Sequence, residues 1–96
     1  MGTRGGKNLK SVEIAADGAV SAKRIMVYGV LLTAAAAAAT LILYDNASAA
    51  SGTKIMTVGA VVGATAAVML PYPILANSGV YADIGGAGAV AYVLVG

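Results

Sequence analysis

The stretch that decides the fold runs from residue 77 to residue 95 and reads Asn-Ser-Gly-Val-Tyr-Ala-Asp-Ile-Gly-Gly-Ala-Gly-Ala-Val-Ala-Tyr-Val-Leu-Val. Its first three residues are a turn signal, because Asn, Ser and Gly accept the backbone conformations of tight turns. Residues 80–84 then have the composition of a strand, and Gly85–Gly88 form a second turn signal. Residues 89–95 are the clearest strand of the chain, with alternate side chains on opposite faces. We therefore expect two strands joined by a glycine-rich turn.

Turn residues also separate short strand-like runs in the part of the chain before residue 77. Residues 53–58 and 65–70 are short apolar runs, separated by Gly59 and Gly63. Pro71-Tyr72-Pro73 is expected to end the second run, because proline has no N–H to donate to a central ladder. Short strands at regular spacing, with Gly, Pro or Asn between them, indicate an all-β sandwich or barrel. We predict an all-β chain whose residues 21–96 form a small β-sandwich or jelly-roll-like domain.

Residues 25–44 allow two interpretations. They are twenty uncharged residues that follow Lys23-Arg24. This length, and the two cations that come before it, are typical of a transmembrane helix. They also mimic a signal peptide, with Ala47-Ser48-Ala49 as the small-residue cleavage pattern, although the apolar core is long for a signal. The competing interpretation is a strand over 25–33 and another over 40–44, joined by alanines. Strands that are apolar on both faces are covered on both faces, which suits a domain placed between partners.

The composition limits the classes of function. The chain has 96 residues, enough for one domain, and it is 59% hydrophobic and only 10% charged. Soluble domains carry about 25% charged residues. Lipid or other subunits should therefore cover much of this surface. The absence of Cys excludes a disulfide scaffold, and the absence of both Cys and His excludes a metal site built from those residues.

The charges gather near the N-terminus. Residues 1–24 hold five cations against Glu13 and Asp17, a net charge of +3, whereas residues 25–96 have a net charge of −1. We predict that residues 1–20 form an extended basic arm across a neighbouring subunit. The alternative is an edge strand on the chain's own sheet, since Val12 and Ile14 alternate. The interaction residues we predict are the five cations, Arg4, Lys7, Lys10, Lys23 and Arg24.

No motif indicates catalysis, and we predict that the chain is not an enzyme. Asp45 and Asp83 each lie beside a turn signal, where Asp is common for conformational reasons. There is no His to act as a base for any Ser, and Gly85–Gly88 lacks the Lys of a phosphate loop. We expect no catalytic residue, cofactor, metal or small-molecule substrate. The five cations of residues 1–24 are separated by glycines and have no aromatic residues between them, so they do not favour nucleic acid as a partner. The five tyrosines suit packing between strands or anchoring at subunit contacts.

One ordered set of motifs spans about residues 23–96. It consists of the segment 28–46, then Ser51-Gly52-Thr53, Leu70-Pro71-Tyr72-Pro73-Ile74, residues 77–84, Gly86-Ala87-Gly88 and a terminal strand. This set resembles small tailed-bacteriophage virion proteins of the capsid decoration (cement) type, although this chain has more alanine and fewer polar residues. The resemblance implies a β-sandwich-like subunit on the capsid surface of a virion. Its partner would be the major capsid protein, and it would form a symmetric homo-oligomer such as a trimer.

Two other classes of function stay open. Residues 25–44 motivate a small integral membrane protein with one or two helices, similar to a holin, for which the membrane would be the partner. The low charge also suits an assembly subunit of a non-viral shell or filament.

Overall fold

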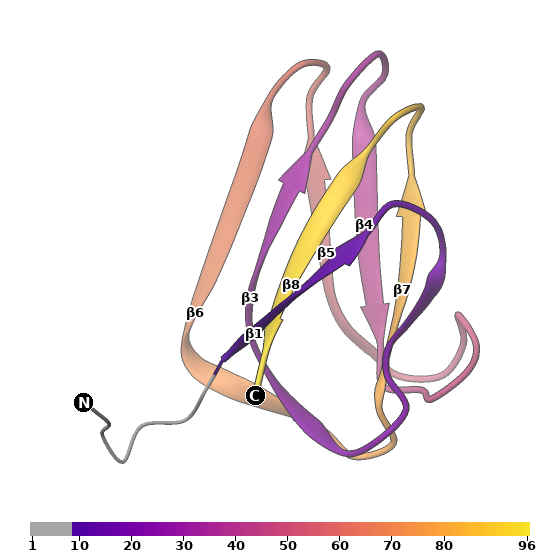
Figure 1. The fold of residues 1–96 in the computed structure, drawn as a ribbon, viewed down its shortest axis with the longest axis vertical. Coiled ribbons are helices and arrows are strands. Elements are labelled where there is room, and N and C mark those ends of the chain that lie inside the picture. Colours follow the sequence, from indigo (N-terminus) through magenta and orange to yellow (C-terminus); the bar gives the residue numbers. More distant parts are fainter. Residues whose placement is uncertain (1–8) are drawn as a thin grey trace.

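The computed structural model describes residues 9–96, and all of their regular structure is β (Figure 1). The eight strands are β1 (Lys10–Ile14), β2 (Gly18–Ser21), β3 (Ile25–Thr33), β4 (Ala39–Tyr44), β5 (Lys54–Ala60), β6 (Thr65–Ala76), β7 (Val80–Gly85) and β8 (Val90–Val95). The prediction of an all-β chain is confirmed. In this described part of the chain, no helix is long and apolar enough to span a membrane.

The strands form two antiparallel sheets that pack face to face (Figure 1). The first sheet has the order β1-β8-β3-β6, and the second sheet has the order β2-β7-β4-β5. This order is that of an eight-stranded jelly roll, in which two Greek keys wrap around one core. The predicted small β-sandwich or jelly-roll-like domain is therefore what the chain forms.

The core lies between the two sheets and follows the two-residue period of the strands. On β8, Ala91, Val93 and Val95 point inward and are buried. Leu41 and Leu43 of β4 do the same from the second sheet. Burying one such leucine or valine contributes about 1.5–3 kcal/mol relative to leaving it exposed. Within residues 9–96 no polar side chain is buried, so the core gains this energy without the cost of desolvating polar groups.

The ambiguous segment 25–44 forms two strands, so a single helix over these residues is wrong. β3 belongs to the first sheet and β4 to the second, and residues 34–38 carry the chain from one sheet to the other. The alanines fit this crossing because neighbouring backbone comes close. A Cβ atom added at Gly86 would be 2.6 Å from the carbonyl oxygen of Ala38. Gly86 also has a φ of 112°, which favours glycine.

The predicted boundary between an arm (1–20) and a domain (21–96) does not match the structure. β1 pairs with β8 from Lys10↔Val95 to Ile14↔Ala91, and β2 pairs with β7. The arm across a neighbour is therefore wrong for residues 10–20, and the edge-strand alternative describes them. The physical reason is that Ile14 is buried and that β1 and β2 each complete a sheet of the chain's own sandwich. The first eight residues, including Arg4 and Lys7, lie outside the described part of the chain.

The two prolines do not end β6, which continues to Ala76. They lie in a bulge, because the pairing of β3 with β6 moves from Val27↔Ile74 directly to Gly29↔Met69. Residues 70–73 of β6 thus stand opposite Tyr28 alone. A proline is tolerated here because β6 is an edge strand and bulged residues leave the ladder.

Candidate interaction surfaces

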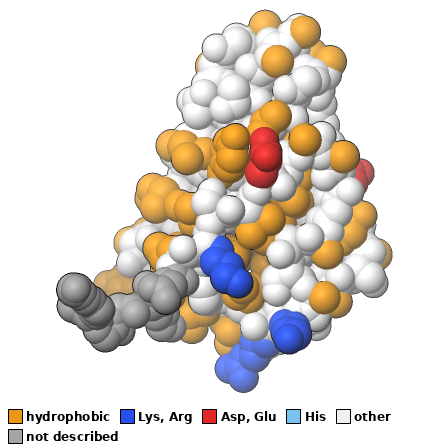
Figure 2. Space-filling view, in the orientation of Figure 1, with side chains coloured by type: hydrophobic (Ala, Val, Ile, Leu, Met, Phe, Trp, Pro, Cys, Tyr) orange, Lys and Arg blue, Asp and Glu red, His pale blue; other side chains and the backbone are white. Residues whose placement is uncertain are grey.

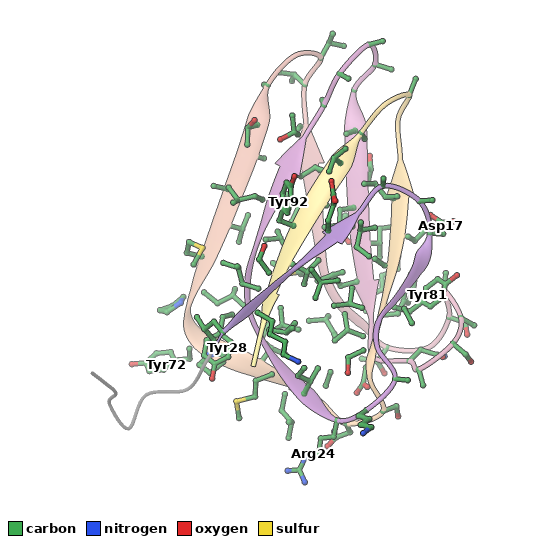
Figure 3. The ribbon with its side chains drawn as sticks, viewed as in Figure 1. Asp17, Arg24, Tyr28, Tyr72, Tyr81 and Tyr92 are labelled. Atoms are coloured by element: carbon green, nitrogen blue, oxygen red, sulfur yellow. The ribbon has the colours of Figure 1, made fainter. Side chains whose placement is uncertain are left out.

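Three of the predicted interaction residues come together at one end of the sandwich. Lys10 begins β1 and pairs with Val95 at the end of β8, while Lys23 and Arg24 connect β2 to β3. The Ser21 hydroxyl donates to the Lys23 carbonyl oxygen (3.0 Å) and accepts from the Lys23 N–H (3.2 Å), which fixes this connection. Cationic side chains lie in the lower part of Figure 2, and Arg24 is at the bottom of Figure 3. We call Lys10, Lys23 and Arg24 the basic end.

The two acidic residues near the N-terminus, Glu13 and Asp17, lie later in the chain than Lys10, at the end of β1 and just after it. Glu13 is near the far end of β1, and its carboxylate accepts a hydrogen bond of 3.4 Å from the Tyr92 hydroxyl. Asp17 follows β1, and its Oδ1 accepts a hydrogen bond of 2.8 Å from the backbone N–H of Ile84. Lys10 and Glu13 are near opposite ends of β1, and because they are three residues apart in a strand their side chains point to opposite faces.

Asp45 has a conformational role. Its two carboxylate oxygens accept hydrogen bonds from the backbone N–H groups of Asn77 (3.2 Å) and Ser78 (2.8 Å), so it ties the β6–β7 turn to the end of β4. Asn46 organises the loop that follows, because its Oδ1 accepts from the N–H groups of Ser48 and Ala49. Among residues 9–96, no three acidic side chains are grouped so that they could hold a metal ion.

The outer side of the first sheet is apolar. Strands β3, β6 and β8 contain no charged residue. The register aligns Tyr92, Leu31 and Ala67 in one row, and Leu94, Gly29 and Met69 in the next. Met69 is 60% exposed, and Leu31 and Tyr92 are also exposed. We call Leu31, Ala67, Met69, Tyr92 and Leu94 the apolar face. Figure 2 views the molecule from this side and shows hydrophobic side chains spread between the acids and the cations.

Tyr72 extends this surface at the edge of the sheet. It is 82% exposed and lies between Pro71 and Pro73 in the β6 bulge. Tyr28 of β3 is opposite the bulge, and Figure 3 shows the two tyrosines close together near the lower edge of β6. Because proline fixes φ, the flanking backbone has little freedom left to lose when Tyr72 meets a partner.

The outer side of the second sheet mixes polar and apolar residues. Ile42 pairs with Thr57 on one side and Asp83 on the other, and Tyr44 pairs with Lys54 and Tyr81. Such mixing is typical of a sheet face that meets water. A further exposed apolar group is at the end opposite the basic end, where Val61 and Val62 follow β5 and are 72% and 61% exposed.

Sequence reasoning did not locate the apolar face. The missing information was the register, because residues of β3, β6 and β8 that are distant in the sequence are brought into rows only by strand pairing. The signal available in the sequence was the absence of charge from all three segments. Comparison with known protein families, with curated proteins and with solved structures finds no match for this chain.

Proposed function

We propose that this chain is a structural virion protein that binds the outside of a phage capsid, through the major capsid protein, and stabilises the shell. The observation that carries the proposal is the outer surface, on which large apolar side chains are exposed and cations are gathered at one end. A small domain with such a surface suits a subunit of an assembly. The assignment to a phage capsid rests on the ordered motifs of residues 23–96.

The jelly roll supports the proposal by analogy. Eight-stranded jelly rolls include viral capsid domains, but also lectins and cupins. A fold alone does not define a function, so the analogy adds to the surface and the motifs and does not replace them.

The stabilisation follows from mass action. A protein that binds the assembled lattice, and not its separated subunits, shifts the equilibrium toward the assembled shell. Burial of apolar area across lattice subunits supplies the free energy, at roughly 25 cal/mol for each Å² removed from water.

The basic end would guide the approach to the shell. Lys23 and Arg24 are exposed, and no carboxylate is paired with them among the hydrogen bonds of the described residues. Cations at the rim of an interface mainly raise the association rate and fix the orientation, and salt screens them. We therefore expect an acidic patch on the capsid and weaker binding at high ionic strength.

The test is particle stability. Virions with this protein should melt at a higher temperature than particles that assemble without it, with the same lattice geometry in both. Adding purified protein to the deficient particles should restore the higher melting temperature. The double variant Lys23→Glu/Arg24→Glu should bind these particles more weakly and with a smaller dependence on salt.

Lys54→Glu is the control, because it reverses a cation at the same end of the sandwich but on β5, at the edge of the second sheet opposite β2. It should bind like the unmodified protein. Equal melting of particles with and without the protein would overturn the stabilising role. Absence of the protein from purified virions by mass spectrometry would overturn the whole proposal.

A further inference from the structure

One edge of the first sheet is open for pairing. β6 is the last strand of that sheet (Figure 1), and among residues 9–96 it pairs only with β3. The N–H and C=O groups on its other side therefore have no strand partner, and such an edge accepts a strand from another chain. Residues 65–70 contain no charge, proline or glycine, and Thr65, Ala67 and Met69 are exposed on the outer side.

The other three edges each have a feature that discourages pairing. β1 has Lys10 and Glu13 in a strand of five residues. β2 is only four residues long, and its pairing with β7 is irregular. β5 begins with Lys54, where its register with β4 shifts. Charges, short strands and bulges are the means by which natural sheets avoid edge-to-edge contact. Residues 65–70 of β6 have none of them.

We propose that residues 65–69 of β6 pair antiparallel with the same residues of a second copy, about a two-fold axis at Ala67. The two first sheets then form one continuous sheet. The pairing uses the backbone at the edge of β6 and leaves the apolar face and the basic end uncovered. The inference therefore goes beyond the proposed function without using the surface that meets the capsid. It is tested on the purified protein alone, so its failure is distinct from a failure to bind capsids.

The alternation of faces and the position of the prolines together fix the axis. Residues directly opposite each other in a sheet lie on the same face, so the axis passes through a residue and not between two residues. An axis at Ala67 places Thr65 opposite Met69 of the other copy, and it places Pro71 opposite the turn before β6, outside the ladder. An axis at Val68 would place Pro71 opposite Thr65, where its missing N–H would weaken the pairing. An axis nearer the start of β6 would pair fewer residues.

This register also brings together the most exposed large apolar side chains among residues 9–96. Tyr72, Val61 and Val62 are 82%, 72% and 61% exposed. Val62 and Tyr72 are each five residues from Ala67, in opposite directions. Antiparallel pairing thus places Tyr72 of one copy level with the Val61–Val62 turn of the other. Because a two-fold interface makes every contact twice, an apolar contact forms at both ends of the paired strands.

The distribution of charge favours a second copy as the occupant of this edge. Residues 55–82 contain no charged residue, so no like charges meet when this part of the chain faces itself. The two-fold axis also turns the basic ends in opposite directions, which keeps the cations of the two copies apart. The outer sides of the two first sheets lie on the same side of the joined sheet. The dimer would therefore present an apolar face twice as wide as that of one copy.

The pairing should be weak in solution and stronger on a shell. Both strands are already ordered within their own sheets, so little conformational freedom is lost when they meet. The contact is smaller than a standard interface, and we expect it to dissociate at micromolar concentrations. Copies bound beside each other on a lattice have a high effective concentration, which favours the same contact.

Sedimentation equilibrium of the purified chain from about 1 to 100 μM tests the pairing. The unmodified protein should shift from monomer to dimer across this range. Ala67→Lys and Ala67→Glu should each weaken the dimer by about fivefold or more, because two like charges then stand directly opposite each other at the axis. An equal mixture of these two variants should dimerise again, because Lys then stands opposite Glu.

Thr57→Lys is the control for the added charge, since Thr57 is exposed on β5, the edge strand of the second sheet. It should dimerise like the unmodified protein, and circular dichroism should show the same β spectrum for all variants. A chain that stays monomeric at about 100 μM would overturn the proposal. So would β6 amides that gain protection from hydrogen exchange only on a capsid. A dimer that persists in Ala67→Lys, or one that does not re-form in the mixture, would overturn the axis.

Disulfide cross-linking tests the register. The chain has no Cys, so a bridge formed by one introduced Cys joins two copies. Opposite residues of an antiparallel pair have Cα atoms about 4.5–5.5 Å apart, within reach of a disulfide. With oxidised glutathione as the oxidant, Ala67→Cys should cross-link.

Thr65→Cys is the matched control on the same strand and face. Its two copies are four residues apart along the paired strands, about 13 Å, which is beyond a disulfide. Thr65→Cys alone should stay uncross-linked, and a mixture of Thr65→Cys with Met69→Cys should give the mixed dimer. Equal cross-linking of Ala67→Cys and Thr65→Cys would overturn the proposed pairing.

Discussion

Met69 of β6 lies directly over Gly29 of β3. A Cβ atom built at Gly29 would be 2.8 Å from Sδ of Met69 and 2.6 Å from the carbonyl oxygen of Val68. The Met69 side chain is flexible, but the carbonyl belongs to the paired strand and cannot move without disturbing the ladder. The contact explains why a glycine interrupts an otherwise apolar strand at this position.

We predict that Gly29→Ala destabilises the fold by about 1–3 kcal/mol, because an added methyl group in a closely packed site forces the backbone to shift. Urea denaturation measured by circular dichroism gives the free energy of unfolding. Gly85→Ala is the control, since a Cβ atom there would have no atom within 4 Å. It should leave stability within about 0.5 kcal/mol or raise it slightly. Equal effects of the two substitutions would contradict the close contact at Gly29.

The second prediction concerns the hydrophobic core, where Leu41 of β4 is fully buried. Leu41→Ala should lower the free energy of unfolding by about 2–5 kcal/mol, because it removes buried methyl groups and leaves a cavity. Val62→Ala removes apolar atoms from an exposed position and should change stability by less than about 0.5 kcal/mol. Thermal and urea unfolding of both variants provide the measurement. A loss below 1 kcal/mol for Leu41→Ala would mean that the two sheets are not packed as described.

Much of this fold follows from local patterns in the sequence. Glycine and asparagine mark the ends of several strands from residue 44 onward, and the alternation in 89–95 agrees with the inward positions of Ala91, Val93 and Val95. The prolines of β6 misled the prediction because their effect depends on whether a strand is central or at an edge, which the sequence does not state. β1 and β2 were missed as core strands for a similar reason: they hold few large apolar residues, and distant pairing with β8 and β7 orders them.

The candidate surfaces were harder to predict than the fold. Lys10, Lys23 and Arg24 were identified by their charge, and strand pairing then placed them at one end. The apolar face depends on the register of three strands, and no local pattern encodes it. The charge on Asp45 gave no indication that its partners would be Asn77 and Ser78, more than thirty residues away.

Asp45 provides the third prediction. Asp45→Ala should lower the free energy of unfolding by about 1.5–3 kcal/mol, because it removes a charged acceptor from two backbone N–H groups. Asp83→Ala is the matched control, since the structure shows no side-chain hydrogen bond for Asp83 with residues 9–96 and it faces outward beside Ile42. Hydrogen exchange should localise the effect, with faster exchange at Asn77 and Ser78 in Asp45→Ala only. Unchanged exchange at these two amides would show that Asp45 does not hold the β6–β7 turn.

The last prediction compares deletion of residues 1–8 with deletion of residues 1–16, to distinguish a role in capsid binding from a role in stability. Deletion of residues 1–8 leaves all eight strands intact, so the melting temperature of the purified chain should be nearly unchanged. The deletion removes Arg4 and Lys7, so binding to the capsid should weaken and become less dependent on salt. Deletion of residues 1–16 also removes β1, uncovers the edge of β8 and takes Ile14 from the core. The shorter chain should unfold or aggregate, because one edge of the apolar strand β8 is left unpaired. If it instead keeps the melting temperature of the full chain, the pairing of β1 with β8 does not contribute to the stability of the sandwich. The arm across a neighbouring subunit would then again be the better account of residues 10–16.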